Sequence, residues 1–266
     1  MAINIIVCVK QVMDPETPAS AFNIDPDAKK VVPAPGIPPV VNGFDENAVE
    51  AALRLKDNGD AAKITVISIG NGFVMDVMKK PLSMGADELV LIDDEGLDGL
   101  DAFATATVLT EAIKKVGDYD LVLCGRQASD WDQAHVPLGI AEMLELPCIT
   151  LAQNIEVVDD GLIVQRALTD GYEVVEAPMP TLVTVTNELG EPRYPTLRGI
   201  MQASRKQPTN WSTADVGLDA SALEPKLTLT ELYIPVSDNQ VEVIEGEDDA
   251  DAGRKLALRL REERLI

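Results

Sequence analysis

Four short apolar runs, each rich in β-branched residues, constrain the fold of this chain more than any other feature. Their sequences are INIIVCV from residue 3, KITVISIG from residue 63, ELVLIDD from residue 88 and DLVLCG from residue 120. Each run is too short to be a lone buried helix, and its unbroken apolar character is typical of a strand covered on both faces. The runs therefore predict the strands of a parallel sheet.

Amphipathic helical patterns lie between these runs. In residues 42–59 the apolar side chains recur at helical spacing, with Asn42 or Asp45 expected to cap the start and Gly59 expected to end the helix. Strands that alternate with such helices form βαβ units with right-handed connections. The sequence therefore predicts an α/β fold with a doubly wound, mainly parallel sheet.

A second helix is predicted over residues 101–117, where Asp101 is the expected cap and Gly117 the expected stop. The helix expected after the run at residue 63 contains Pro81, which should end or kink it because proline lacks the N–H of the helical ladder. No functional role is predicted for Pro81.

From about residue 155 the pattern changes to hairpins. Asp160-Gly161 and Asp170-Gly171 are turn signals between short strands, which predicts antiparallel hairpin strands at one edge of the sheet. Residues 207–266 then form an acidic, polar tract that ends in a short amphipathic helix. We interpret residues 1–206 as the α/β domain and residues 207–266 as an arm that packs on a partner, with a disordered acidic tail as the alternative.

Charge and composition exclude several classes of function. The formal net charge of −23, from 45 Asp+Glu and 22 Lys+Arg, argues against nucleic acid and against anionic lipid as partners. Cys8, Cys124 and Cys148 fall in apolar runs without metal-ligand spacing, so we expect buried thiols and no metal site. No leader segment and no apolar run near the ~18 residues of a membrane span is recognisable. We expect a soluble cytoplasmic protein without membrane insertion.

Polar side chains are concentrated where the run at residue 120 ends and the next helix begins. The segment GRQASDWDQAHV, from Gly125 to Val136, holds the only histidine, His135. In a parallel sheet, ligands bind at the carboxyl ends of strands, and backbone N–H groups at a helix start suit a phosphate. Gln127, Asp130 and Asp132 are candidates to bind ribose and adenine edges. A turn capped by these carboxylates, with a solvated polar surface, explains the segment equally well.

Catalytic motifs are not recognisable. The sequence has no G-x-S-x-G elbow, no P-loop and no G-x-G-x-x-G fingerprint, and the single histidine has no apparent nucleophile beside it. We therefore expect that the chain is not an enzyme by itself and that a cofactor carries any chemistry.

Six segments, spread over essentially the whole chain in order, resemble the β subunit of electron transfer flavoprotein. They are IIVCVKQVMD, NGFDENAVEAALRLK, MGADE, GRQASDWDQ, DGYEVVEAPMPTLVTV and EPRYPTLRGIMQASRK. The resemblance implies a heterodimer with an α subunit that holds the redox FAD. It also implies an adenine nucleotide in this chain, either AMP or, in electron-bifurcating members, a second FAD. Trp131 adds bulk where bifurcating members usually have glycine, which favours AMP.

The resemblance also assigns residues to the nucleotide. The implied contacts lie at carboxyl strand ends and helix starts, where a ligand is also expected from the residues alone. They are Cys8, Asn42, Gly43, Phe44, Asp45, Ile69, Gly125, Arg126, Gln127, Ala128, Ser129, Asp130, Trp131, Asp132, Gln133, Ala134, His135 and Val136.

The segment 190–203 is the implied recognition loop for partner proteins, with Tyr194, Leu197, Ile200 and Met201 as its contact residues. The implied function is to carry electrons from flavin dehydrogenases to a quinone oxidoreductase or another downstream acceptor. A nucleotide-binding regulatory protein of the universal-stress type shares the α/β layout and is the alternative, although it would need neither the arm nor the recognition loop.

Overall fold

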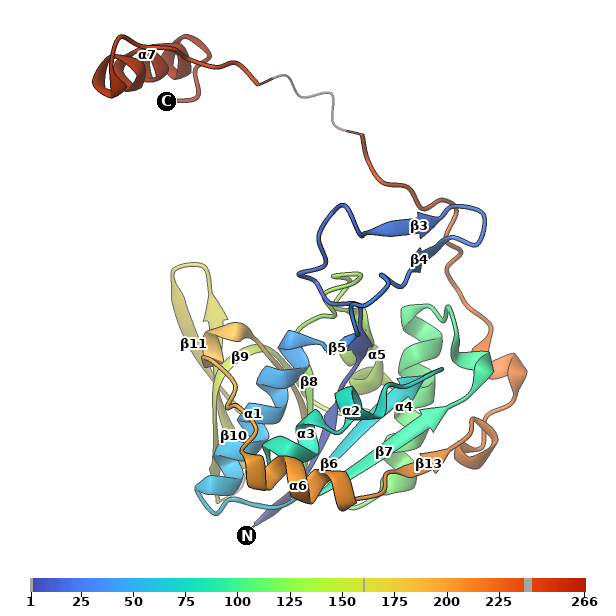
Figure 1. Cartoon of the computed structure of the whole chain (residues 1–266). Helices are drawn as coiled ribbons and strands as arrows, with labels where there is room; N and C mark the ends of the chain where they lie inside the picture. Colours follow the sequence, from blue (N-terminus) through green and yellow to red (C-terminus); the bar gives the residue numbers. More distant parts are fainter. Residues whose placement is uncertain (1, 160, 237–240) are drawn as a thin grey trace. The chain divides into compact units, whose positions relative to one another are not determined.

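The computed structural model describes residues 2–159, 161–236 and 241–266. The chain forms two compact units, Met1–Thr230 and Glu231–Ile266. The first unit contains a large sheet flanked by helices (Figure 1). It extends past residue 206, where the sequence pattern had suggested that an arm begins.

A nine-stranded sheet, counted over the described residues, forms the centre of the first unit. Its order is β11-β10-β9-β12-β8-β1-β6-β7-β13. The four predicted runs are β1 (Ile3–Cys8), β6 (Ala61–Gly70), β7 (Glu88–Asp93) and β8 (Leu121–Gly125), and neighbours among them pair in parallel. The predicted doubly wound, mainly parallel sheet is confirmed.

Helices cover both faces of this sheet, and each face has its own apolar core. One core lies under α1 (Gly43–Asp57), α3 (Lys80–Met84) and α6 (Leu197–Arg205), and the other lies under α4 (Ala102–Val116) and α5 (His135–Met143). Asp101 caps α4 by accepting a hydrogen bond from the Ala104 N–H, as predicted, and Gly117 ends that helix.

The hairpin strands are β9 (Cys148–Val158), β10 (Gly161–Leu168) and β11 (Gly171–Ala177), which pair antiparallel at one edge as predicted. Asp160, half of the first turn signal, lies outside the described residues. The next strand, β12 (Thr181–Val185), does not continue the hairpins. It enters the sheet between β8 and β9 and is parallel to both.

Short elements complete the first unit. The interruption expected at Pro81 is confirmed, because α2 (Met75–Met78) ends before α3, which has Pro81 in its first turn. Two small antiparallel pairs join β2 (Gln11–Val12) to β5 (Val40–Val41) and β3 (Asn23–Asp25) to β4 (Lys30–Val32). Strand β13 (Thr209–Trp211) adds to β7 in parallel at the second edge. The 3₁₀ turns are η1 (Glu95–Leu97), η2 (Asn187–Leu189), η3 (Ala214–Val216) and η4 (Ala220–Leu223).

The second unit contains the predicted terminal helix, α7 (Asp249–Glu262). Asp248 caps it by accepting from the Asp251 N–H, and Leu256 and Leu258 are about half exposed on its surface. Among the described residues, no helix is long and apolar enough to cross a membrane.

The cysteines agree with the prediction in two cases of three. Cys8 and Cys124 are buried partners in the β1–β8 register, and a hydrogen bond with Cys8, together with burial, raises the pKa of the Cys124 thiol. Cys148 is exposed at the start of β9, so its predicted burial was wrong. An apolar run indicates a strand but does not reveal which of its ends reaches the surface.

Candidate functional site

The predicted ligand site lies where the order of the parallel strands reverses. Strand β1 has β6 on one side and β8 on the other, and the chain reaches β6 long before β8. A crevice opens between the carboxyl ends of strands at such a point. Residues 42–45, at the start of α1, and residues 125–136, between β8 and α5, meet at these ends. We call these two segments together the cradle.

Gly125 lies where the two segments of the cradle approach each other most closely. A Cβ atom added there would lie 2.6 Å from the Phe44 carbonyl carbon and 2.7 Å from the Asp45 nitrogen. Real Cβ atoms do not approach backbone atoms so closely. Only glycine at this position lets the end of β8 contact the first turn of α1.

Asn42 joins the two segments of the cradle. Its side chain is fully buried, its Nδ2 donates to Gln127 O at 2.8 Å, and its Oδ1 accepts from Ser129 N at 3.1 Å. It occupies the N-cap position of α1 but makes no capping hydrogen bond, so the predicted capping role was wrong. The amide instead fixes the loop that follows β8.

Asp45 is a buried carboxylate that joins three segments. Its Oδ2 accepts from the Lys10 N–H at 2.8 Å and its Oδ1 accepts from the Gly125 N–H at 3.1 Å. It lies inside the first turn of α1, so it does not cap that helix either. Burial raises the pKa of Asp45 to about 7, and the hydrogen bonds from Lys10, Asn42 and Gly125 offset only part of that effect.

The two other carboxylates of the cradle are paired with side chains. Lys10 Nζ forms an ion pair with Asp130 at 2.6 Å, and Gln127 Nε2 donates to Asp132 Oδ1 at 2.6 Å. Ala134, in a left-handed conformation, precedes α5, and no side chain caps this helix. The alternative in which the loop's carboxylates cap it was therefore wrong. Lys10 was missed as a site residue, although its place two residues after β1 was a usable signal.

Backbone donors are concentrated at the start of α5. The N–H groups of Gln133, Ala134, His135 and Val136 have no hydrogen-bond acceptor in the part of the chain that the structure describes. They lie at the positive end of the α5 helix dipole. Four successive donors of this kind are suited to an anion such as a phosphate.

The remaining residues assigned to the nucleotide vary in accessibility. Arg126 lies over the Phe44 ring, 4.9 Å from its centroid, which joins the two segments again. Trp131 and His135 are exposed, Ile69 is half-buried at the end of β6, and Cys8 is buried. Cys8 therefore presents little side-chain surface to a ligand, and its contribution would come from the backbone at the end of β1. The positions not yet described are Gly43 and Ala128, exposed and half-buried respectively.

The predicted recognition loop is partly helical. Residues 197–205 form α6, and Thr196 caps it by accepting from the Gly199 N–H at 3.0 Å. The four predicted contact residues are all exposed, at 92% for Tyr194, 76% for Leu197, 51% for Ile200 and 54% for Met201. We call Tyr194 and the exposed face of α6 the docking face, after the recognition role that the family resemblance implies for this segment.

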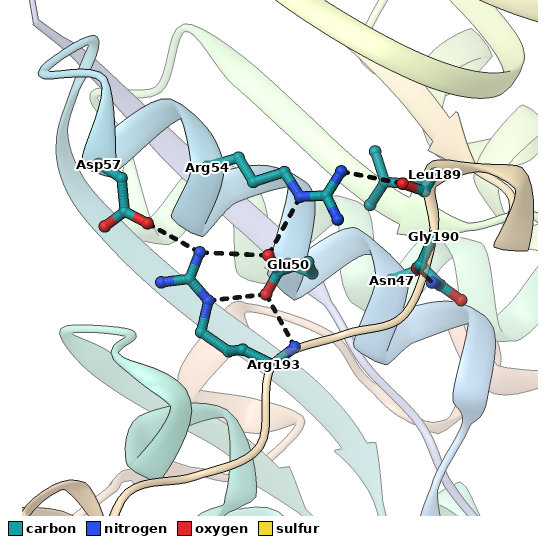
Figure 2. A network of polar contacts seen from close by, with 7 residues as sticks. All are labelled: Asn47, Glu50, Arg54, Asp57, Leu189, Gly190 and Arg193. Carbon is teal, nitrogen blue, oxygen red and sulfur yellow. Dashed lines mark hydrogen bonds and ion pairs between the residues drawn. The ribbon is translucent and has the colours of Figure 1, made fainter.

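A buried carboxylate, Glu50 of α1, holds the segment before α6 (Figure 2). Glu50 accepts hydrogen bonds from the Arg193 backbone N–H at 3.1 Å, from Arg193 Nε at 2.7 Å and from Arg54 Nε at 3.1 Å. Arg193 also pairs with Asp57 at 2.8 Å. Although burial opposes ionisation, these partners hold the pKa of Glu50 below its usual value. The network therefore fixes the backbone next to Tyr194.

Comparisons with known proteins agree with this arrangement. Residues 35–216 match the electron transfer flavoprotein domain. The chain is 43% identical to the electron transfer flavoprotein subunit beta of Megasphaera elsdenii, over 82% of this chain and 81% of the relative. It is 36% identical to the caffeyl-CoA reductase-Etf complex subunit CarD of Acetobacterium woodii, over 99% of this chain and 100% of that one. It is also 36% identical to the acryloyl-CoA reductase electron transfer subunit gamma of Anaerotignum propionicum, over 77% of this chain and 75% of the relative.

The fold and the cradle define a doubly wound α/β protein with anion donors at the reversal of strand order. The chain belongs to the electron transfer flavoprotein family, and its relatives include beta subunits of that family. The family resemblance seen in the sequence is confirmed, and the universal-stress alternative is not favoured. The relatives are electron-transfer subunits, which agrees with a carrier role and with association with a flavin.

Proposed function

We propose that this chain is the β subunit of a heterodimer whose α subunit holds the redox FAD. The complex carries electrons from flavin dehydrogenases to a quinone oxidoreductase or another downstream acceptor. In this assignment the β subunit performs no covalent chemistry. It binds an adenine nucleotide in the cradle and presents the docking face to the partner.

The observation that carries the nucleotide proposal is the run of four N–H groups, Gln133 to Val136, without acceptors among the described residues. A phosphate placed there would be bound by backbone donors at the positive end of a helix. The nearby carboxylates of Asp130 and Asp132 are engaged by Lys10 and Gln127, which reduces their repulsion of the anion. These donors support a phosphate although the protein carries a net charge of −23.

We propose AMP as the nucleotide, with a second FAD as the alternative. The consecutive donors end at Pro137, which has no N–H, so the helix start offers one compact phosphate site. The alternative is favoured by the similarity to a subunit of a caffeyl-CoA reductase-Etf complex over nearly the full length of both chains. A second FAD would make electron bifurcation the function of the complex.

The test is to denature the purified heterodimer and to quantify the nucleotides that it releases. One FAD and one AMP per heterodimer is the expected result. Two FAD per heterodimer would show that the second nucleotide is FAD and not AMP, as the bifurcating alternative requires. One FAD without any other nucleotide would contradict the nucleotide role of the cradle.

We further propose that the second unit, Glu231–Ile266, is an arm that packs on the α subunit. Its helix α7 exposes Leu256 and Leu258, while Leu265 and Ile266 after it are 70% and 74% exposed. Such side chains are expected to find cover in a partner. A chain that ends at Thr230 should keep its sheet, as measured by circular dichroism, and should fail to co-purify with the α subunit. Full recovery of the heterodimer with this shortened chain would contradict the proposal that Glu231–Ile266 packs on the α subunit.

A further inference from the structure

A hollow lies at the end of the sheet opposite to the cradle. It has a volume of about 240 Å³ and is bordered by the first residues of β1 and β6 and by the end of α4. The cradle, in contrast, lies at the carboxyl ends of the strands. We call this hollow the amino-end pocket. Its volume corresponds to about eight water molecules at ~30 Å³ each, which is enough for a small organic ligand.

Two polar side chains from neighbouring strands enter the amino-end pocket. Asn4 of β1 and Thr65 of β6 line it. Both point to the face of the sheet that α4 covers, because Ile6 and Ile67, two residues further along the same strands, belong to the core under that helix. Thr65 is only 3% exposed, and its hydroxyl forms no hydrogen bond with the described residues. A buried hydroxyl without a partner is unfavourable unless a ligand or water binds it.

Asn4 is held in place through its backbone. Its N–H donates to Asp120 Oδ2 at 2.8 Å, and its carbonyl accepts from the Asp120 N–H at 2.9 Å. The side-chain amide of Asn4 forms no hydrogen bond within the part of the chain that the structure describes. The amino-end pocket therefore presents an amide and a hydroxyl that are positioned by the sheet and are available to a ligand.

Charges of both signs border the amino-end pocket. Lys63 lies beside Asn4 in the β1–β6 register, and its Nζ pairs with Glu88 at 2.7 Å. On the other side α4 ends at Val116, where the last carbonyls carry the negative end of the helix dipole. The exposed Asp118 follows this helix and forms no ion pair with the described residues. The strands therefore offer hydrogen-bond donors, and the end of the helix offers acceptors.

We propose that the amino-end pocket binds a small zwitterion, namely an amino acid with a short aliphatic side chain. Its carboxylate would accept hydrogen bonds from the Thr65 hydroxyl and the Asn4 amide, with Lys63 at the rim. Its ammonium group would bind to Asp118 and to the last carbonyls of α4, and its side chain would contact the apolar part of the lining. The inference does not depend on the proposed electron-transfer function, because the pocket and the cradle lie at opposite ends of the strands.

The test measures the binding of L-valine to the full-length chain, alone and in complex with the α subunit, by saturation-transfer NMR. Two analogues test the need for each charge. They are 3-methylbutanoate, which lacks the ammonium group, and 2-methylpropylamine, which lacks the carboxylate. We expect L-valine to bind at least about tenfold more tightly than either analogue, because each analogue leaves some polar groups of the pocket unpaired. No saturation transfer to L-valine at about 10 mM, or equal binding of the three ligands, would overturn the inference.

Thr65→Val removes the hydroxyl and keeps the shape of the side chain. The affinity for L-valine should fall about tenfold, whereas the melting temperature without ligand should not fall, because no partner within the chain is lost. The matched control is Thr184→Val in β12, which is also 3% exposed but whose hydroxyl accepts from the Leu151 N–H at 3.0 Å. The control should lower the melting temperature and leave the affinity for L-valine unchanged. Asp118→Asn should weaken the binding of L-valine but not that of 3-methylbutanoate.

Three results with these proteins would contradict the inference. An affinity for L-valine that Thr65→Val leaves unchanged would place the ligand elsewhere. A lower melting temperature of the Thr65→Val variant without ligand would show that the hydroxyl already has a partner. Binding that the chain alone shows and the complex loses would mean that the α subunit covers the pocket. None of these results bears on the nucleotide in the cradle, which is measured separately.

Discussion

Helix α1 holds both the cradle and the docking face, but the two regions differ in the groups that they offer to a ligand. At the start of α1, Asn42 and Asp45 bind the backbone of the segment after β8. Further along the helix, Glu50 binds the backbone and side chain of Arg193. The cradle offers backbone N–H groups, whereas the docking face offers exposed apolar and basic side chains.

This difference determines how each region should respond to substitution. Backbone donors do not depend on the side chains of the loop. The cradle should therefore keep its nucleotide when exposed side chains are replaced, and lose it when the backbone geometry is altered. The docking face depends on its side chains directly, so single substitutions should change recognition without changing the fold. Four predictions test this contrast, in order of decreasing effect.

The largest effect is expected for Gly125→Ala. The added Cβ would collide with the backbone of Phe44 and Asp45, which should destabilise the protein by about 3 kcal/mol and empty the cradle. Urea unfolding and nucleotide analysis of the heterodimer measure both effects. Gly43→Ala is the control, because an added Cβ meets nothing within 4 Å there, and it should change stability by less than about 0.5 kcal/mol. Equal behaviour of the two variants would refute the close approach at Gly125.

Glu50→Ala should have the next largest effect, on the side of the docking face. It leaves Arg193 without its main partner, and since the Arg193 side chain is one-third exposed, we expect a loss of about 2 to 3 kcal/mol. The KM for the electron donor should rise while the nucleotide content stays constant. Glu111→Ala, which breaks an exposed pair with Lys114, should cost about 0.5 kcal/mol or less. Loss of the nucleotide in the Glu50 variant would mean that the structure of the cradle depends on the Glu50 network, contrary to this prediction.

Asp45→Asn should remove a pH dependence of stability. The pKa of Asp45 is raised from 3.8 to about 7, so between these values the folded protein holds a proton that the unfolded chain has released. Stability from this group is therefore present at low pH and is lost as pH rises, by about 2 kcal/mol from pH 5 to pH 7. The difference in unfolding free energy between the wild type and the variant should change by this amount between pH 5 and pH 7. Parallel curves for the two proteins would rule out the raised pKa.

The smallest effect is expected for Gln133→Ala. The Gln133 side chain is exposed, and its proposed role uses the backbone N–H only. The affinity for AMP should change by less than about threefold, since no side-chain contact is removed. Isothermal titration with the nucleotide-depleted heterodimer measures this affinity. A tenfold loss would show that side chains of the loop carry the binding.

Local patterns in the sequence predicted the parallel strands, the helices α1 and α4, the break at Pro81 and the edge hairpins. The central position of β12 was not predicted, because a strand next to hairpins reads as another antiparallel strand until its pairing with β8 is known. The family resemblance implied a loop over residues 190–203. Thr196 nevertheless caps a helix there, and Gly199 lies against Ser83 of α3, where a side chain would not fit.

The sequence predicted where the residues of the candidate site lie in the fold, but it did not predict the contacts of their side chains. Its position at the carboxyl ends of the strands follows from the fold class. The roles of individual side chains depend on partners far away in the sequence, such as Lys10 for Asp130. Sequence spacing alone left ligand binding and local capping equally possible. Glu50 was missed for the same reason, since its partner Arg193 lies 143 residues away.

The most direct test of the central claim is the structure of the nucleotide-loaded heterodimer at a resolution that defines the phosphate. We expect a phosphate oxygen within about 3 Å of the backbone nitrogens of at least two of the residues Gln133 to Val136. We also expect Asn42 to keep its hydrogen bonds to Gln127 and Ser129. A nucleotide bound elsewhere, or a phosphate held by side chains while these amides face water, would contradict the account.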